Sequence, residues 1–470
     1  PNTLDTGARM IDYWDFIRRI EEGEILKEDA YDRLVGQAAA EVVKKFDIAY
    51  DPDDPVPADD RLADRLFEAA VELFLRLGIY VIDTRRVVRF TREELAEALA
   101  AAPDRVVYGR GNDQVTVPHR AVEDPADPVV FFSAVGTPHP EEDFVAVCRS
   151  YAQEPLADTF SGPLITAYRG MPVASGTPVE VEAGIWNVVK LREAARFAGR
   201  PNMPIHNFMS IAERTDATIA AARPELGALP GDGLFTAAIA EMKVDYERLK
   251  RIAFQLHTPY VIGGLYGPLM GGYAGGPQAT AVILVAHHFL GLLAFRAHRH
   301  NGFPINIHQT CNTTREMLWL VSVAGQAIAR NTRLVTAANA FMASGPCTEM
   351  ITRELAAHAV ASTVSGWHLN PAAVARNRQP GHSSGMEARI HAEVGYVTAR
   401  AGLSRKDASR VVKALLERYE KGIKQAPPGK SFRECYDPVA VRPTGEYLGL
   451  WDRAKKELGA LGLDFRLLYD

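Results

Sequence analysis

The sequence predicts an α/β fold: a closed (β/α)8 TIM-type barrel with helical N- and C-terminal extensions. After the Asp/Pro-rich stretch Glu123–Pro128, short apolar runs alternate with long segments of helical periodicity. Strands that alternate with helices need crossover connections, and these produce a parallel sheet. At least six such repeats follow one another, and no dinucleotide-binding fingerprint follows the first run, so a closed barrel is favoured over an open sheet.

The N-terminal region, residues 1–125, is charged and predicted to be a helical extension packed on the barrel. Apolar residues recur at helical spacing over Leu62–Leu77, and Gly78 stands where a glycine would end that helix. Thr91 and Glu94 form a capping box that predicts the start of the next helix.

Residues 126–400 are predicted to form the barrel, and residues 401–470 a C-terminal helical extension. Six apolar runs are the predicted strands: Val129–Val135, Asp158–Ile165, Met203–Met209, Tyr260–Leu265, Pro304–Gln309 and Leu334–Phe341. Two more strands are expected between residues 366 and 400. Helical length and periodicity predict helices at Phe235–His257, Ala279–His298, Thr313–Arg330, 404–423 and 444–460.

Composition excludes several classes of protein. A net charge of −5 over 470 residues gives no basic surface for nucleic acid. The longest apolar stretch, Ala279–Phe295, contains His287 and His288, so we expect a buried helix and no membrane contact. The first residues show no signal peptide. Four widely spaced cysteines form no CxxC pair, which favours a reduced, soluble, cytoplasmic chain.

Polar side chains follow several predicted strands where barrel enzymes place their chemistry, at the C-terminal ends of the strands. His206 lies near the end of the third run and His308 near the end of the fifth, while Asn339 and Phe341 end the sixth. Tyr266 follows the fourth run. We therefore expect these five residues to share one pocket. Any one of them alone is equally consistent with a hydrogen-bonded structural residue.

The loop Gly271–Gly276 could let a ligand approach the backbone closely, since glycines lack side chains. It lacks the Gly-Lys-Ser/Thr of a phosphate loop. A flexible loop over the barrel mouth, with Tyr273 as a lid or docking contact, is the alternative interpretation.

The residues alone also allow two other kinds of site, a metal site and a cysteine nucleophile. His206, His308 and Asp232 could form a metal site of two histidines and a carboxylate. Cys347 precedes a predicted helix, whose N-terminus would lower its pKa and activate it as a nucleophile. Simple packing beside the Gly345-Pro346 turn is the alternative for this cysteine.

Seven strings occur in order along almost the whole chain: Leu77–Thr84, Gly199–Met203, Gly271–Gly276, Thr313–Glu316, Gly345–Met350, Gly385–Arg389 and Phe432–Asp437. On these strings the chain resembles the monomethylamine methyltransferase family, whose members are corrinoid-dependent. The resemblance implies a (β/α)8 barrel with helical extensions, usually a homo-oligomer. It also implies that a small methylated substrate delivers its methyl group to the Co(I) corrinoid (cobalamin) of a separate carrier protein, with no cofactor bound tightly to this chain.

Strand-end position and the resemblance together predict the roles of the site residues. We expect His206 and Asn339 to act in catalysis. We expect the substrate to be bound by Tyr266, His308, Phe341, Leu265 and Phe208. We expect a loop to face the corrinoid with Gly271, Gly272, Tyr273, Gly275 and Gly276.

The sequence departs from the family pattern at the site itself. The family position of pyrrolysine, which forms an adduct with methylamine, holds His206. The glutamate, glutamine and tyrosine that surround pyrrolysine correspond to Leu265, Asn339 and Phe341. We therefore expect a non-pyrrolysine enzyme that does not use monomethylamine.

Two kinds of methyl donor fit such a site. A quaternary amine is already charged and leaves as a neutral tertiary amine, and Tyr266, Tyr273, Phe208 and Phe341 could form an aromatic cage for it. An ether or thioether would instead need His206 as a general acid. Two alternatives lie outside this class: a metal-dependent barrel hydrolase or lyase that uses His206 and His308, and a catalytically silent homologue that only binds a corrinoid protein.

Overall fold

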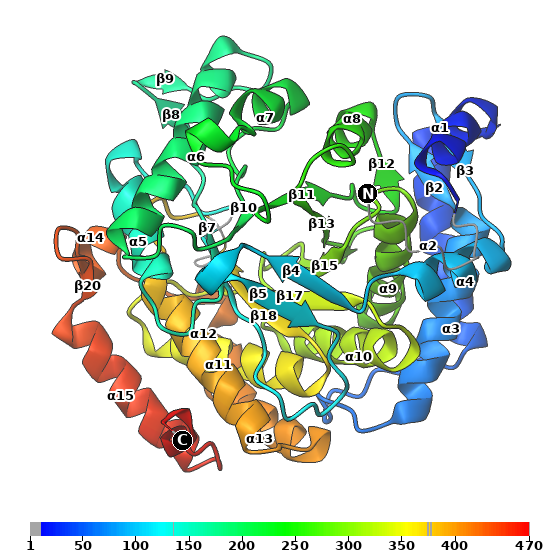
Figure 1. The fold of residues 1–470 in the computed structure, drawn as a ribbon. Coiled ribbons are helices and arrows are strands. Elements are labelled where there is room, and N and C mark those ends of the chain that lie inside the picture. The colour runs from blue at the N-terminus through cyan, green and yellow to red at the C-terminus, as the bar shows by residue number, and fades with distance from the viewer. Residues whose placement is uncertain (1–10, 135, 374–375, 377, 470) are drawn as a thin grey trace.

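Eight parallel strands close a barrel in a computed structural model that describes residues 11–134, 136–373, 376 and 378–469 (Figure 1). Three strands form one sheet and five form the other. A bridge between Val130 and Leu369 joins the two sheets on one side, and Phe208 N–H donates to Gly233 O (3.1 Å) on the other. In order around the barrel the strands are β6 (Phe131–Phe132), β7 (Thr159–Ser161), β10 (Ile205–Asn207), β11 (Gly233–Ala237), β13 (Val261–Tyr266), β15 (Arg299–Gly302), β17 (Val335–Phe341) and β18 (His368–Ala373).

A helix follows each strand and covers the outside of the barrel. Threonine side chains cap three of these helices, because Thr177, Thr314 and Thr348 each accept a backbone N–H at a helix start. No helix in the described ranges is long and apolar enough to cross a membrane. The eight helices are α5 (Phe144–Ala152), α6 (Pro178–Phe197), α7 (Thr215–Ala221), α8 (Tyr246–Gln255), α9 (Pro277–Leu293), α10 (Arg315–Asn331), α11 (Glu349–Val364) and α12 (Gly385–Arg400).

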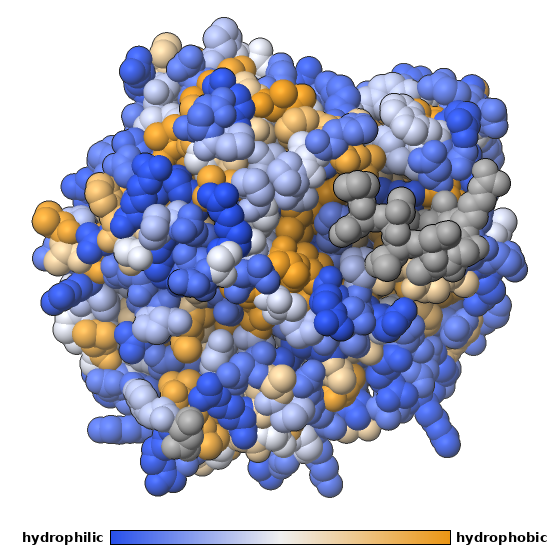
Figure 2. Space-filling view, viewed as in Figure 1, coloured by the Kyte–Doolittle hydropathy of each residue, from blue (hydrophilic) through white to orange (hydrophobic). Residues whose placement is uncertain are grey.

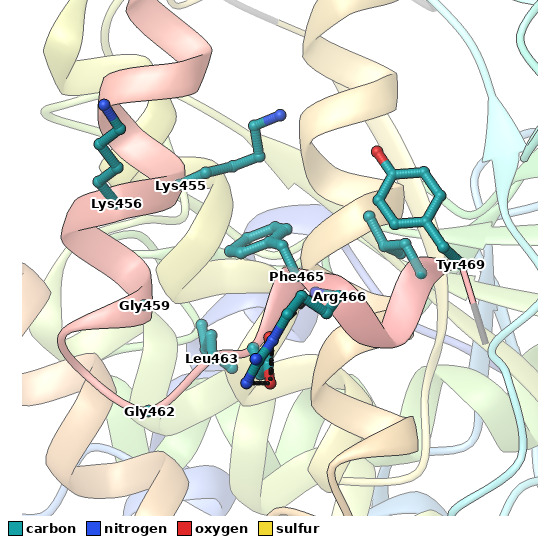
Figure 3. A pocket seen from close by; sticks show the side chains of 10 residues that line it. Lys455, Lys456, Gly459, Gly462, Leu463, Phe465, Arg466 and Tyr469 are labelled. Atoms are coloured by element: carbon teal, nitrogen blue, oxygen red, sulfur yellow. Dashed lines mark hydrogen bonds and ion pairs between the residues drawn. The ribbon is translucent and has the colours of Figure 1, made fainter.

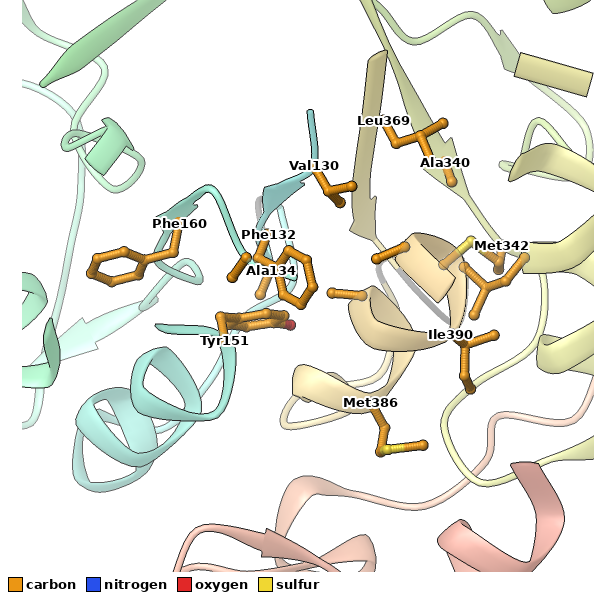
Figure 4. Packing of buried hydrophobic residues seen from close by; sticks show 14 of the residues in the cluster. Val130, Phe132, Ala134, Tyr151, Phe160, Ala340, Met342, Leu369, Met386 and Ile390 are labelled. Atoms are coloured by element: carbon orange, nitrogen blue, oxygen red, sulfur yellow. The ribbon is translucent and has the colours of Figure 1, made fainter. Parts of the chain in front are cut away.

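The space between barrel and helices is filled by buried apolar side chains. Figure 4 shows this packing where β6 and β18 meet α5 and α12, with Phe132 against Tyr151 and with Leu369 above Ile390. Because side chains alternate along a strand, the residues that fill this layer leave the others to face the lumen.

The N-terminal helices pack on α9 and α10 and share one apolar core with them. Gly78 ends α3 with a φ of 67°, and Thr91 and Glu94 form the predicted capping box of α4. The extension joins the barrel through a parallel pair of β2 and β12. Its elements are α1 (Tyr13–Glu22), β1 (Glu24–Ile25), α2 (Glu28–Lys45), α3 (Asp60–Leu77), β2 (Ile79–Val81), β3 (Arg86–Val88) and α4 (Arg92–Ala101), and its barrel partner is β12 (Lys243–Val244).

A hairpin of β4 (Arg105–Tyr108) and β5 (Val115–Pro118) covers the N-terminal end of the barrel. Figure 1 shows it in front of the strands, and Figure 2 shows hydrophobic residues gathered near the centre of the same face. Gly109 N–H donates to Gly231 O (3.0 Å), and His368 Nε2 lies 2.7 Å from Pro118 O. Tyr108 packs inside with Phe131. The lumen is therefore closed at this end and opens only at the other.

The C-terminal helices pack beside α11, and Tyr419 OH donates to Thr313 O (2.6 Å). The division of the chain at residues 125 and 400 stays a prediction. The remaining elements are α13 (Arg405–Tyr419), α14 (Phe432–Cys435) and α15 (Gly445–Gly459), with the short paired strands β8 (Ala167–Tyr168), β9 (Met171–Pro172), β14 (Leu269–Met270), β16 (Ile305–Asn306), β19 (Tyr436–Asp437) and β20 (Arg442–Pro443).

Three strand assignments were wrong. The fifth predicted run, Pro304–Gln309, lies beyond the barrel strand, which is the polar β15. The segment predicted as a helix from Phe235 starts inside β11, and its helix begins only at Tyr246. Among the described residues between 366 and 400, β18 is the one strand, so the overlooked strand was the fourth of the barrel. Periodicity failed here because the sheet accepts Arg299 and Asn301 in its closed interior.

Burial of histidines predicts an acid-sensitive fold. Burial lowers the pKa of nine of the 13 histidines and raises that of six carboxyl groups, among them Glu241 (to about 8) and Asp158 (to about 6). Below a pH of about 6.5 the unfolded chain protonates these histidines while the folded chain does not, so stability falls as pH falls. The carboxyl groups act in the opposite direction, since their contribution is lost as pH rises through their folded pKa.

Because nine histidines outnumber six carboxyl groups, we expect the melting temperature to fall steadily between pH 7 and pH 5. Differential scanning calorimetry at half-unit pH steps measures this. A melting temperature that is higher at pH 5.5 than at pH 7.5 would contradict the assignment of these histidines as neutral.

Candidate functional site

The lumen holds a row of polar side chains between the hairpin and the mouth. Arg299 and Asn301 point inward from β15, and Arg299 Nε donates to Asn301 Oδ1 (2.8 Å). Asn301 Nδ2 donates in turn to Asn339 Oδ1 of β17 (2.7 Å). At the closed end, Arg299 Nη1 lies 3.3 Å from the hydroxyl of Tyr108. These contacts form a continuous hydrogen-bonded row along the barrel axis.

His206 is fully buried in the lumen, in the middle of β10. Its ring lies against Phe131 and Phe235, with centroid distances of 5.5 and 5.8 Å. Its Nδ1 is 2.9 Å from Thr159 Oγ1, whereas its Nε2 has no hydrogen-bond partner in the described part of the chain. His206, expected near a strand end in a shared pocket, is thus enclosed within the lumen.

Burial, and then the charge of Arg299, holds the pKa of His206 well below its usual value. The imidazole is therefore neutral at working pH and has one ring nitrogen free toward the lumen. A neutral imidazole can donate or accept a hydrogen bond, but it is a poor general acid. This electrostatic setting argues against the predicted proton-donating role of His206.

Arg299 is the lumen residue that sequence reasoning missed. It is fully buried, and its guanidinium lies over the rings of Phe131 (3.4 Å to the centroid) and Phe235 (4.8 Å). Burial lowers its pKa to about 10, so it stays charged at neutral pH. Its Nη2 has no partner, and no carboxylate of the described residues forms an ion pair with it. The available signal was the run Arg299–Gly302, which lacks the apolar character expected of a strand.

A pocket of about 390 Å³ opens at the mouth, over β10, β11 and β13. Phe235 lines it and also contacts Arg299 and His206, so its ring separates the pocket from the deeper lumen. That ring lies on the bare backbone of Gly263, where a Cβ would be 1.8 Å from Phe235 Cδ1. The residues lining the pocket are Ser175, Asn207, Met209, Ser210, Ala212, Glu213, Arg214, Phe235, Ala237, Asp245, Glu247, Arg248, Arg251 and Leu265.

Helix α8 fixes the rim of this pocket. Arg248 Nε donates to Ala237 O (2.7 Å), and Arg251 Nη2 donates to Glu213 O (2.6 Å). Both arginines thus bind the backbone at the ends of barrel strands and in the following loop. Their guanidinium groups therefore fix the backbone that forms the rim of the pocket.

Tyr266 does not face the lumen, contrary to prediction. Its hydroxyl lies 2.9 Å from His300 Nδ1, and its ring packs on His288 of α9 at 4.8 Å. Because side chains alternate along a strand, Leu265 at the pocket requires Tyr266 to point to the helices. His300 points outward beside Arg299 for the same reason.

The predicted aromatic cage is not formed. Phe208 is buried in the outer core against Tyr260, with ring centroids 4.9 Å apart, after a register shift between β10 and β7. Tyr273 is 54% exposed. Phe341, at the end of β17, stacks on Phe303 at 5.8 Å.

His308 and the glycine loop lie together at the surface. His308 is exposed, and its Nε2 is 3.2 Å from the position of a Cβ on Gly271. The pairing of β14 with β16 brings these two segments together. The structure thus separates exposed His308 from fully buried His206, and the predicted pocket that contains both is wrong.

The predicted metal site is also wrong. Asp232 accepts from Arg192 Nη2 (2.7 Å) and Ile205 N–H (2.9 Å) at the start of β11, away from exposed His308. No group of three or more histidine, cysteine, aspartate or glutamate residues within the described ranges could hold a metal ion. Cys347 is not an activated nucleophile either, since burial raises its pKa.

A buried carboxylate that sequence reasoning missed fixes the loop after β17. Glu354 of α11 accepts from Ala343 N–H (2.8 Å) and Ser344 N–H (3.0 Å), and from the hydroxyls of Thr313 and Ser344. It therefore ties the start of α10 to the strand that carries Asn339.

A larger surface cavity, about 630 Å³, lies elsewhere, beside α15 (Figure 3). Two of its charged residues already form ion pairs, Arg466 with Asp464 and Lys455 with the neighbouring Asp452. Nothing about this cavity indicates catalysis.

Comparison with known proteins gives a consistent result. A family model described as monomethylamine methyltransferase MtmB matches residues 11–463. The chain is 32% identical over 468 residues to a monomethylamine methyltransferase MtmB of Methanosarcina mazei, covering 98% of this chain and 100% of that one. The crystal structure of the Methanosarcina barkeri monomethylamine methyltransferase superposes with a TM-score of 0.93 at 32% identity, covering 97% of this chain and 99% of that one. A hydroxylamine complex of MtmB gives the same values.

Full burial of His206 predicts that its truncation destabilises the protein. We expect His206→Ala to leave a cavity beside Phe131 and an unpaired Thr159 hydroxyl, costing about 2–4 kcal/mol. His308→Ala, at an exposed histidine, is the matched control and should change stability by less than about 0.5 kcal/mol. Urea denaturation of both variants measures the difference. Equal stability of the two variants would show that His206 is not packed as described.

Proposed function

The chain belongs to the monomethylamine methyltransferase family, and on that premise we propose that it moves a methyl group from a small methylated donor to the Co(I) corrinoid of a separate carrier protein. The corrinoid, held by that partner, supplies a nucleophilic metal centre that accepts the methyl group. The proposal includes a cytoplasmic homo-oligomer with no tightly bound cofactor of its own. It is supported by a barrel whose lumen opens only at the mouth, where a carrier could dock.

The proposal is that transfer proceeds without pyrrolysine. The site offers His206 in its place, and this residue is neutral, fully buried and bound through Nδ1 to Thr159. It has no group that converts an unactivated amine into a charged adduct. The single observation that carries this proposal is therefore the full burial of His206, whose Nε2 has no hydrogen-bond partner among the described residues. The donor must already hold its methyl group on an atom that departs without being protonated.

The remaining lumen residues have positioning roles in this proposal. Asn301 and Asn339 hold each other through their amides and can orient a bound donor. Phe131 and Phe235 exclude water around His206. Orientation and exclusion of water are the main contributions that such a transfer requires from the protein.

We predict that purified protein will not methylate reduced free cobalamin from monomethylamine, but will do so from a donor with a positively charged methyl-bearing atom. The reason is that a neutral amine is a poor leaving group and the site lacks a means to activate it. The spectral change from Co(I) to methyl-Co(III) measures transfer, with protein-free cobalamin as the background control. Efficient transfer from monomethylamine would overturn the proposed mechanism, and no transfer from any donor would favour a silent homologue.

A further inference from the structure

We propose that the methyl donor carries a carboxylate, which binds Arg299 in the lumen, and that its methyl-bearing atom points to the mouth. This inference rests on the proposed methyl transfer and narrows its substrate class. It makes Arg299 a specificity-determining residue.

Arg299 is a buried charge that has no counter-ion among the described residues. Arg299 is fully buried, and its contacts among the described residues are the neutral groups of Asn301 and Tyr108 and the faces of aromatic rings. A buried charge is ordinarily neutralised by an ion pair, because leaving water is costly. Other buried arginines here follow that rule or bind carbonyls: Arg192 pairs with Asp232, and Arg120 donates to Ala126 O and Asp124 O. A charge kept without a counter-ion inside a closed lumen is typical of a ligand site.

The lumen beside Arg299 excludes ligands that carry only a positive charge. The aromatic faces that could bind a cation, those of Phe131 and Phe235, are already covered by the guanidinium of Arg299. A second cation at this depth would be repelled by the first. A purely cationic donor therefore has no place beside Arg299, whereas an anionic group gains both charge and hydrogen bonds there.

One nitrogen of Arg299 and one of His206 are placed to bind the same ligand. Arg299 Nη2 and His206 Nε2 are both buried, and neither has a hydrogen-bond partner among the described residues. Both side chains contact the rings of Phe131 and Phe235, which places them on the same two aromatic neighbours. A carboxylate has two oxygens, so it can accept from Nη2 and, in the Nε2–H tautomer, from His206.

The closed end of the barrel sets the direction of the donor. Tyr108 of the hairpin blocks the lumen below Arg299, so the rest of the molecule must extend past Phe235 toward the mouth pocket. Phe235 forms the floor of that pocket, and its ring must move to admit the donor. This direction brings the methyl group toward the side from which a carrier protein can approach.

The chemistry balances without a further reactant. The bond from the methyl carbon to a positively charged nitrogen breaks, and its electron pair stays on nitrogen, which leaves as a neutral tertiary amine. The new bond from carbon to cobalt uses the electron pair of Co(I), which becomes methyl-Co(III). No proton moves, which agrees with a lumen whose histidine is neutral. The proposed substrate is thus a zwitterion, with a carboxylate at Arg299 and a methylated ammonium group nearer the mouth.

The test compares ligands that share a trimethylammonium group. N,N,N-trimethylglycine and 4-(trimethylammonio)butanoate carry the carboxylate at two spacings, and tetramethylammonium lacks it. We expect wild-type protein, in isothermal titration calorimetry, to bind at least one zwitterion about 10-fold or more tightly than tetramethylammonium. Equal binding of all three, or no binding of either zwitterion, would overturn the proposal.

Arg299→Met should remove the preference for the carboxylate while keeping the melting temperature equal or raising it, because a buried unpaired charge is lost. Arg120→Met is the matched control: it removes a buried arginine outside the lumen and should leave the preference unchanged. A preference that survives in Arg299→Met would overturn the role of this residue. If Arg299→Met fails to fold, the wild-type comparison of the three ligands still tests carboxylate binding. Arg299→Lys keeps the charge but loses the planar guanidinium, so its preference for the carboxylate should be weaker.

The two proposals fail in different ways. A zwitterion that binds through Arg299 but never methylates reduced cobalamin supports the carboxylate site and contradicts methyl transfer. Methylation from tetramethylammonium that is as fast as from either zwitterion supports methyl transfer and contradicts the carboxylate site.

Discussion

The interior of this barrel is organised by the positive charge of Arg299, which has no counter-ion in the described part of the chain. Arg299 enters the lumen from β15 and is held by the hydroxyl of Tyr108, the amide of Asn301 and two aromatic rings. Each of these contacts is neutral, so the charge is oriented without being cancelled. Burial, and then this charge, holds the pKa of His206 well below its usual value. A lumen with this electrostatic character favours anionic or zwitterionic ligands and disfavours acid catalysis, and both consequences follow from one side chain.

Hydrogen bonds fix the loop after β17 and the rim of the mouth pocket on either side of Arg299. Glu354 anchors the loop after β17, and Arg248 and Arg251 anchor the rim of the mouth pocket. Between them the ring of Phe235 lies on Gly263, where no side chain could be added. The same ring also contacts the guanidinium of Arg299 and the ring of His206, so a donor that enters the lumen must displace these contacts.

The sequence was sufficient to predict the barrel, the helix caps and the family, because these depend on periodicity, on cap residues and on strings such as Gly345–Met350. The sequence was not sufficient to predict which side chains face the lumen. Arg299 was missed since a strand of Arg-His-Asn-Gly has no apolar pattern, and β11 was hidden within a segment of helical periodicity. Tyr266 and Phe208 were assigned to the site from their positions in the chain. Their orientation depends on strand alternation and on a register shift in β10, and an uncertain strand boundary cannot supply either.

The central claim is that the lumen recognises a carboxylate through Arg299, and the most direct test is a crystal structure of the protein grown in saturating acetate at pH 7. Acetate is the smallest methyl-bearing carboxylate, and its binding does not depend on methyl transfer or on a carrier protein. The account predicts an acetate oxygen within hydrogen-bonding distance of Arg299 Nη2, with its methyl group toward Phe235. A lumen without acetate, or acetate bound only at surface arginines, would contradict it.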